Sequence, residues 1–272
     1  MDNESWIIVG ATWDGVKPEA YQSHLRLALY TARMHTGPLD WLCQPRKPIA
    51  AACTEVIGAA LKAGTDWILY LDDDVVPPAD AMVRLREAAN EATRPVVSAL
   101  ATFRTAPYWP SIFETQSWGE RKSVARPMPV MDWPENECIE VFGTGLCATL
   151  VHKSVFERIG RPWFAQTDDF TPDGWFFLQC QRANVPIHCH TGVQVGHLAT
   201  EVATPDSYRI WCRHHGGPEA ARALAVAKWR TSAFPPVDEI NGDGIGPGEP
   251  GWLESLPAEL REQFSLTRRE FD

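Results

Sequence analysis

Residues 66–78 read DWILYLDDDVVPP, a short apolar run that ends in three consecutive carboxylates. Trp67 to Leu71 is rich in β-favouring residues, which predicts a parallel strand buried on both faces. In open α/β sheets, ligands bind beyond the carboxyl ends of such strands, where Asp72, Asp73 and Asp74 fall. Because side chains alternate along an extended segment, we expect Asp72 and Asp74 to point to one side and Asp73 to the other. Two carboxylates on one side can hold Mg²⁺ or Mn²⁺, and an ordinary acidic turn is the alternative.

The flanking segments favour the ligand-binding interpretation. Pro48 to Gly64 predicts a helix that begins with proline and ends at glycine. Ala79 to Ala92 predicts a second, amphipathic helix, and Pro95 to Leu100 predicts the next strand. The order helix, strand, acids, helix, strand is typical of the α/β class.

Four blocks of the chain resemble the GT-A nucleotide-sugar glycosyltransferases, especially the family-2-like and phage-type branches. They are residues 66–78 between their two helices, 142–164, 171–187 and 195–198, in that family's order and together covering roughly residues 6 to 200. The resemblance implies a GT-A (Rossmann-like) fold, with a mixed, mainly parallel sheet flanked by helices.

The resemblance also implies a metal site. Asp74 corresponds to the direct ligand of the Asp-x-Asp motif, Asp72 to a ribose contact or a water-mediated ligand, and Asp73 to a further donor contact. His197 of the late Gly-His block would complete the metal shell, although a lone histidine near a strand end is often structural. The ion, Mn²⁺ or Mg²⁺, would neutralise the charge that develops as the nucleoside diphosphate leaves.

The nucleotide pocket is expected at the end of the first strand, Trp6 to Trp13. In the resembled fold, Ala11 and Thr12 would face the base and ribose of the donor. The glycines of Gly143-Thr144-Gly145 would let the backbone approach a sugar closely, or simply form a tight turn.

Asp173 aligns with the catalytic base of the resembled family. A carboxylate at a helix N-terminus can accept the proton of an acceptor hydroxyl, and a capping role is the alternative. Pro172 departs from the usual Glu-Asp pair, and Asp168 and Asp169 lie close enough upstream to compete for the role. With Asp173 as the base, a single displacement with inversion is expected.

The acceptor region is expected around the base. Trp163 and Trp175 flank Asp173 and are candidates for stacking on a sugar ring, although tryptophan is also a common core residue. Residues 104–136 predict an irregular excursion or β-hairpin over the site. Modified nucleic acid, surface polysaccharide and protein side chains all remain possible acceptors.

Composition bounds the class of protein. The 272 residues are 44% apolar and 22% charged with a net charge of −10, which disfavours a general nucleic-acid-binding surface. The absence of a long apolar run or a signal-peptide pattern predicts a cytoplasmic protein without a membrane span. Seven scattered cysteines argue against a disulfide framework.

We expect a catalytic domain over residues 1–203, with a donor half to about 103 and an acceptor half from about 104. A helical extension follows over 204–234, in which residues 214–217 (HHGG) can divide one helix into two. Residues 235–272 predict a flexible connector and a short terminal helix.

The sequence therefore predicts a metal-dependent, inverting glycosyltransferase that uses a nucleoside-diphosphate sugar. A magnesium-dependent phosphohydrolase or nucleotidyltransferase is one alternative, because acids at strand ends also build such sites. A non-catalytic nucleotide-sugar-binding protein is another, motivated by Cys53-Thr54 and Pro172 at positions where relatives carry polar groups.

Overall fold

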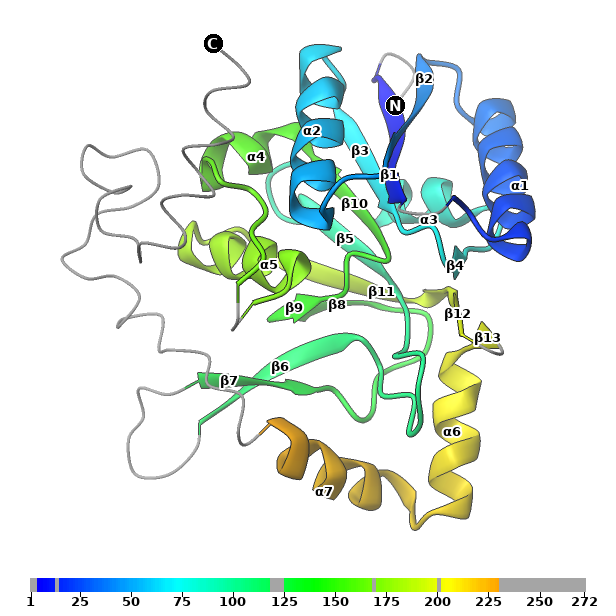
Figure 1. The fold of residues 1–272 in the computed structure, drawn as a ribbon, viewed down its shortest axis with the longest axis vertical. Helices are drawn as coiled ribbons and strands as arrows, with labels where there is room; N and C mark the ends of the chain where they lie inside the picture. The colour runs from blue at the N-terminus through cyan, green and yellow to red at the C-terminus, as the bar shows by residue number, and fades with distance from the viewer. Residues whose placement is uncertain (1–3, 13–14, 118–124, 168–169, 200–201, 230–272) are drawn as a thin grey trace, which may run out of the picture.

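A seven-stranded sheet forms the centre of the protein. The computed structural model describes residues 4–12, 15–117, 125–167, 170–199 and 202–229. The strands of the sheet are β1 (Trp6–Thr12), β2 (Leu39–Pro45), β3 (Trp67–Leu71), β5 (Val96–Leu100), β8 (Cys138–Val141), β10 (Ala148–His152) and β11 (Ile187–Gln194). Their order is β2-β1-β3-β10-β5-β11-β8, and β10 and β8 run against the other five (Figure 1). The predicted mixed, mainly parallel sheet is confirmed.

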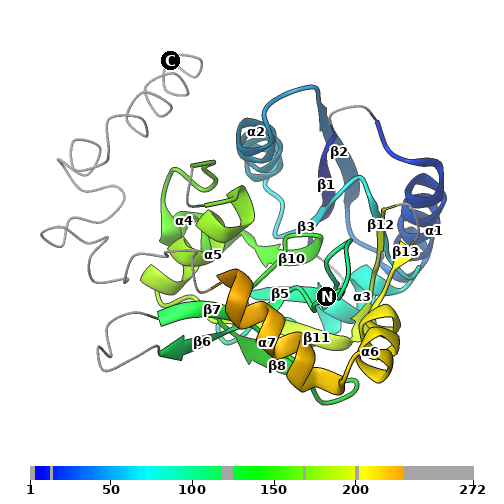
Figure 2. The same cartoon turned by 60° about the horizontal axis from the view of Figure 1, so that its bottom comes forward.

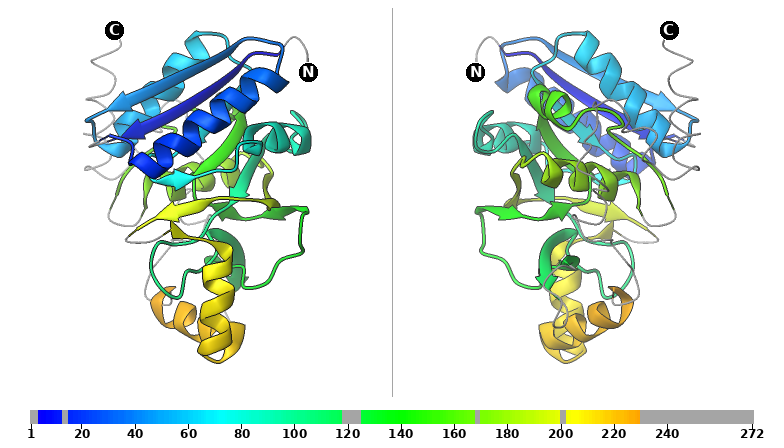
Figure 3. Two further views of the ribbon diagram at one scale, coloured as in Figure 1. Left: turned by 90° about the vertical axis from the view of Figure 1, so that its right-hand side faces the viewer. Right: turned by 90° about the vertical axis from the view of Figure 1, so that its left-hand side faces the viewer.

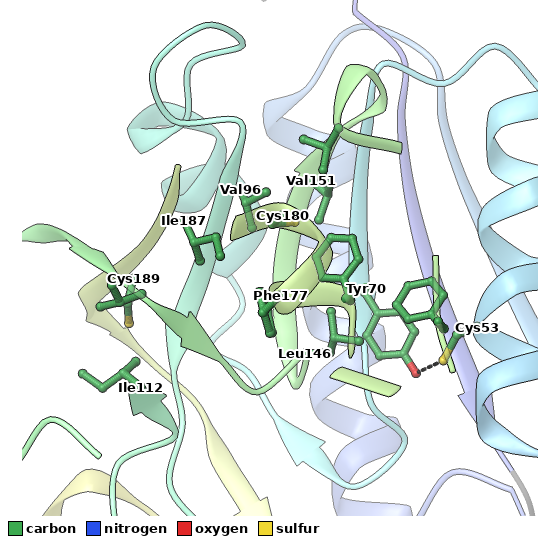
Figure 4. Packing of buried hydrophobic residues seen from close by; sticks show 14 of the residues in the cluster. Cys53, Tyr70, Val96, Ile112, Leu146, Val151, Phe177, Cys180, Ile187 and Cys189 are labelled. Carbon is green, nitrogen blue, oxygen red and sulfur yellow. Dashed lines mark hydrogen bonds between the residues drawn. The ribbon is translucent and has the colours of Figure 1, made fainter. Parts of the chain in front are cut away.

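Helices cover both faces of this sheet, as Figure 3 shows. One face carries α2 (Ile49–Lys62), α4 (Lys153–Ile159) and α5 (Pro172–Arg182), and the other carries α1 (Pro18–Met34) and α3 (Ala81–Ala88). Strand β3 has the predicted bounds, and all five of its residues are buried. Its side chains alternate between the two cores because consecutive strand residues point to opposite faces. Tyr70 packs on the α2 side, where its hydroxyl lies 3.2 Å from Cys53 Sγ (Figure 4).

The second predicted helix is shorter than the sequence suggests. It was expected to reach Ala92, but α3 ends at Ala88. The Asn90 side-chain oxygen accepts the backbone N–H groups of Ala92 and Thr93, each at 3.0 Å. This local hydrogen bonding folds the chain into a turn in place of a further helical turn.

Asp66, which directly precedes β3, contacts residues at the ends of the two neighbouring strands β1 and β10. Its carboxylate accepts the backbone N–H of Ser5 at 2.8 Å, just before β1, and the Lys153 ammonium at 2.7 Å, just after β10. Burial opposes ionisation, but the Lys153 and Ser5 contacts outweigh it and lower the pKa of Asp66. The ionised Asp66 carboxylate therefore stabilises the folded state fully above the ordinary pKa of 3.8. This stabilisation is lost as the pH falls through the lower pKa that Asp66 has in the folded state.

We expect Asp66→Asn to lower the free energy of unfolding by about 1–2 kcal/mol at pH 7. The difference from wild type should shrink as the pH is lowered below 3.8. Urea unfolding at pH 7 and in steps toward pH 3 measures it, with Asp80→Asn as the control because Asp80 makes no side-chain cap at α3. A difference that does not change with pH would contradict a role for the ionised carboxylate.

A small three-stranded sheet brings the late Gly-His block to the acidic strand end. It consists of β4 (Val75–Val76), β12 (Gly196–Leu198) and β13 (Val202–Ala203), in the order β13-β12-β4. His197 pairs with Val75, and the Leu198 N–H donates to the Asp74 carbonyl at 2.7 Å. Two segments far apart in the sequence therefore meet beside Asp74.

A second three-stranded sheet and two helices form the lower part of the molecule (Figures 1 and 2). The sheet contains β6 (Ile112–Ser117), β7 (Ala125–Pro129) and β9 (Gly143–Thr144), so the predicted hairpin within residues 104–136 is confirmed. The helices are α6 (Pro205–His214) and α7 (Gly217–Trp229). Gly216 and Gly217 divide them with positive φ angles of 91° and 79°, which confirms the predicted break.

Helices α6 and α7 are hydrogen bonded to the rest of the fold. The Trp109 indole N–H donates to the Ala221 carbonyl of α7 at 3.0 Å, and the Tyr208 hydroxyl of α6 donates to the Met131 carbonyl at 3.0 Å. The predicted connector and terminal helix at 235–272 lie outside the described residues. Among the helices of the described ranges, none has the length and apolar character needed to cross a lipid bilayer.

Candidate active site

A cavity of about 740 Å³ lies beyond the carboxyl ends of β3 and β5. Asp72, Asp73, Asp74, Asp173 and His197 all line it. These side chains come from three separate blocks of the sequence. The structure therefore brings together the predicted metal and base residues in one place.

Asp74 is the most fully paired carboxylate in the cavity. Its Oδ2 lies 2.7 Å from Arg104 Nη1, and its Oδ1 lies 3.3 Å from His197 Nε2. Burial alone would raise the pKa of Asp74, but the hydrogen bond and charge of His197 and the charge of Arg104 hold it below its usual value. Asp74 is therefore an ionised carboxylate that already binds positive groups.

His197 is oriented by a backbone carbonyl. Its Nδ1 lies 2.8 Å from the Thr102 carbonyl oxygen, which can only accept, so Nδ1 carries the proton. Burial works to lower the pKa of His197, yet the contacts with Asp74 and the Thr102 carbonyl outweigh it and raise that pKa. Nε2 therefore donates to Asp74 while the ring is charged, and a cation that displaces this proton would meet the Nε2 lone pair, as in many metal-binding histidines.

Asp72 and Asp73 both line the cavity but differ in their neighbours. Burial, followed by the charges of Asp74 and Asp173, raises the pKa of Asp72 to about 7. The Asp73 charge acts on Asp72 and also on His24 of α1 and Cys43 of β2, where burial is the larger cause and lowers the pKa of His24 but raises that of Cys43. The four aspartates of the cavity therefore share one electrostatic environment, because Asp73, Asp74 and Asp173 all act on Asp72.

Asp173 lies in the first turn of α5. Thr171 caps this helix by accepting the Gly174 N–H at 3.4 Å. The Asp173 carboxylate also accepts the Gly174 N–H at 2.9 Å, and the residue lines the cavity. Both the base and the helix-terminus interpretation remain compatible with this position. The competing Asp168 and Asp169 lie outside the described residues.

The donor set suits a hard divalent cation, although it is not a complete cage. Within the described ranges, no three His, Cys, Asp or Glu side chains converge as a ready-made metal cluster. Asp74 and His197 form a facing pair, whose carboxylate oxygens and Nε2 would be the ligands of such an ion. A divalent ion held by such a pair takes its remaining ligands from water and substrate phosphate, as Mg²⁺ usually does.

The two candidate acceptor tryptophans belong to the core. Trp163 is 7% exposed and Trp175 is 3% exposed. Their indole N–H groups donate to the backbone carbonyls of Phe156 and Pro162, each at 3.0 Å, and neither residue lines the cavity. We therefore do not retain them as acceptor contacts. The aromatic residues that do line the cavity are Tyr70, Phe103, Phe113, Phe142 and Phe177.

The expected contacts at the end of β1 also lie outside the cavity lining. Ala11 is 4% exposed and packs in the core. Thr12 is used locally: its hydroxyl accepts the Gly15 N–H at 2.9 Å and its carbonyl accepts the Arg46 N–H at 2.8 Å. The position of β1 gives no support to a donor contact by either side chain.

Gly143-Thr144-Gly145 lines the cavity, but packing explains its glycines. A Cβ on Gly145 would lie 2.5 Å from Ser111 Oγ, and one on Gly143 would lie 3.3 Å from Phe177 Cβ. The glycines therefore let this turn pack against the second sheet and α5. Cys53, which stands where the resembled family carries a polar group, also has a packing role. It is 1% exposed and hydrogen bonded to Tyr70 at the cavity wall.

Two residues of the site were not predicted from the sequence, Thr102 and Arg104. Thr102 supplies the carbonyl that orients His197, and Arg104 supplies the cationic partner of Asp74. Both follow β5 directly, and β5 runs in the same direction as β3. The rule that ligands bind beyond the carboxyl ends of such strands could have identified them as neighbours of the acids.

Comparison with solved structures finds A197 from STIV, with a TM-score of 0.52 and 18% sequence identity over 74% of this chain and 91% of that chain. The likeness is one of fold. Together with the mixed sheet and its flanking helices, it supports the GT-A-like fold predicted from the sequence.

Two further structures are more distant. One is a glycosyltransferase involved in the glycosylation of the major capsid of PBCV-1, with a TM-score of 0.31 and 15% identity over 58% of this chain and 69% of that one. The other is GalNAc-T7 with UDP, GalNAc and Mn²⁺, with a TM-score of 0.45 and 10% identity over 78% of this chain and 48% of that one. No family model and no curated protein matches the chain.

Proposed function

We propose that the protein transfers a sugar from a nucleoside-diphosphate sugar to a hydroxyl acceptor, with the help of Mn²⁺ or Mg²⁺. The observation that carries this proposal is the meeting of Asp74, His197 and Asp173 in one cavity at the carboxyl edge of the sheet. This edge is the usual ligand site of α/β sheets, and the cavity is large enough for a sugar nucleotide.

The charges of the cavity favour a role for a divalent cation. Four aspartates line the cavity, and its described basic residues are Arg104 and His197. A diphosphate would meet net repulsion there unless a cation were bound between the carboxylates and the phosphates. Asp74 and His197 would hold that cation, which supplies Lewis-acid stabilisation of the leaving diphosphate.

Asp173 is proposed as the general base. It lies at the N-terminus of α5 and lines the same cavity as Asp72 and Asp74. A base on the acceptor side removes the hydroxyl proton during a single displacement, so inversion at the anomeric carbon is part of the proposal.

The first test is a thermal-shift titration with UDP-, GDP-, TDP- and CDP-linked sugars, with and without Mn²⁺. One nucleotide class should raise the Tm only when Mn²⁺ is present, by about 5–10 °C at a donor concentration about 100 times Kd. Asp74→Asn should abolish the Mn²⁺-dependent part, because it removes a charged ligand. Asp80→Asn, which removes an acid outside the cavity lining, should behave as wild type.

Stabilisation that is equal in Asp74→Asn and wild type would exclude Asp74 as the metal ligand. No stabilisation by any donor would contradict glycosyl transfer. Hydrolysis of the donor with no transfer to any sugar, nucleic acid or protein acceptor would instead favour the phosphohydrolase interpretation.

A further inference from the structure

Arg104 occupies the position in the cavity where a cation is expected. Its Nη1 lies 2.7 Å from Asp74 Oδ2, while His197 contacts the other oxygen of the same carboxylate. Among the described residues that line the cavity, Arg104 is the only lysine or arginine. The guanidinium therefore neutralises Asp74 at a point where a divalent ion would have to bind.

The side chain of Arg104 is exposed while its backbone is held. The Arg104 side chain is 53% exposed, whereas that of Asp74 is 14% exposed. The loop that carries Arg104 is closed by hydrogen bonds from the Phe103 N–H to the Trp109 carbonyl and from the Ser111 N–H to the Ala101 carbonyl, both at 2.8 Å. An arginine on a closed loop can change partner by rotating its own side chain, without disturbing the core.

We propose that Arg104 exchanges partners during the catalytic cycle. It holds Asp74 when the cavity lacks a divalent cation, and it passes to the diphosphate of the donor when the cation takes its place. The inference rests on the proposed function and adds a residue to it. A guanidinium and a divalent ion compete for the same carboxylate oxygen, and the displaced guanidinium remains beside the cavity, where its planar N–H fork fits phosphate oxygens.

This exchange predicts effects of opposite sign in one variant. Arg104→Gln removes the competitor, so Mn²⁺ alone should bind about two- to fivefold more tightly, the factor expected for loss of a half-exposed ion pair. The same variant lacks the charged phosphate contact, so a nucleoside diphosphate in saturating Mn²⁺ should bind about tenfold or more weakly. A residue with a merely structural role would not move the two constants in opposite directions.

The experiment measures both constants on the full chain. Binding of MnCl₂ alone is followed by the electron paramagnetic resonance signal of free Mn²⁺. Binding of UDP, GDP, TDP and CDP is then measured by calorimetry in saturating Mn²⁺. Arg104→Lys, which keeps the charge but loses the planar fork, should stay near wild type for Mn²⁺ and weaken the nucleotide less than Arg104→Gln. Arg26→Gln, an exposed arginine on α1, is the matched control.

Two results would overturn the exchange while leaving the proposed function intact. In the first, the wild type binds both Mn²⁺ and a nucleotide, and Arg104→Gln leaves both binding constants unchanged. The second is an Arg104→Gln variant in which Mn²⁺ binds more weakly, since the guanidinium would then support the metal site. A wild type that binds neither Mn²⁺ nor any of the four nucleotides would overturn the proposed function and the exchange with it.

Discussion

Asp173→Asn is expected to slow release of nucleoside diphosphate from a bound donor by about 10²–10⁴-fold, the usual contribution of a general base. The amide keeps the shape of the side chain but cannot accept the acceptor proton. Binding of the donor should be preserved, because the proposed metal ligands Asp74 and His197 are unchanged. The measurement is turnover at saturating donor and Mn²⁺ with water or an added hydroxyl acceptor, alongside the Mn²⁺-dependent thermal shift.

The chain supplies a matched control for the helix-terminus interpretation. Residues 171–173 and 204–206 have the same sequence, Thr-Pro-Asp, and in both the threonine caps a helix whose first turn contains the aspartate. An acid there stabilises a helix N-terminus by about 0.3–1 kcal/mol wherever it lies. Asp206→Asn should therefore cost similar stability to Asp173→Asn but leave turnover unchanged.

Turnover that survives Asp173→Asn within a few-fold would contradict its role as the base. The corresponding variants Asp168→Asn and Asp169→Asn would then show whether the base lies at either of these two positions. The anomeric configuration of the product, followed by nuclear magnetic resonance, tests inversion independently. Retention would remove the need for a base at Asp173 altogether.

Local sequence features predicted the acidic edge of the sheet well. Strand β3 ends at Leu71 as expected, because an apolar β-branched and aromatic run followed by charged residues and two prolines allows few other structures. The expected opposite orientation of Asp73 assumed an extended chain with a period of two, whereas residues 73 and 74 form a turn after β3 and all three acids line the cavity. The prediction of β3 itself needed no knowledge of the rest of the fold.

Contacts between distant segments could not be read from those patterns. The antiparallel insertion of β10 between β3 and β5 is a matter of topology, which an apolar five-residue strand does not specify. The pairing of β4 with β12 sets His197 beside Asp74, and the resemblance, not the local pattern, suggested that meeting. Arg104 was missed because exposed arginines in loops are common and only the fold shows which carboxylate is near.

The two tryptophans were predicted as ligand contacts for the same reason, because their burial could not be read from the local sequence. Trp163 and Trp175 flank Asp173 in sequence, but α5 turns Trp175 away from the cavity and toward the Pro162 carbonyl. An indole has both an apolar surface for a core and a polar N–H, so its type alone does not distinguish packing from ligand binding. Burial and the partner of the N–H group make that distinction, and both are tertiary properties.

The packing of α5 under Asp173 leads to a prediction for stability. Phe176 is 0% exposed and contacts three other phenylalanines, with ring centroids 5.8 Å from Phe156, 5.4 Å from Phe164 and 5.2 Å from Phe177. Phe176→Ala is expected to lower the free energy of unfolding by about 3–5 kcal/mol, since it removes buried area and leaves a cavity that close-packed rings cannot fill. Urea unfolding followed by tryptophan fluorescence measures the loss.

Two companion variants separate cavity formation from a general loss of apolar surface. Phe176→Leu keeps most of the side-chain volume and should cost clearly less than Phe176→Ala. Leu29→Ala, at a residue of α1 that is 52% exposed, should stay within about 0.5 kcal/mol of wild type. A loss below about 1 kcal/mol in Phe176→Ala would contradict tight packing of α5, because a collapsed or loosely packed site tolerates truncation. The fixed position of Asp173 in the proposed mechanism would then lose its support, since α5 is the element that carries this residue into the cavity.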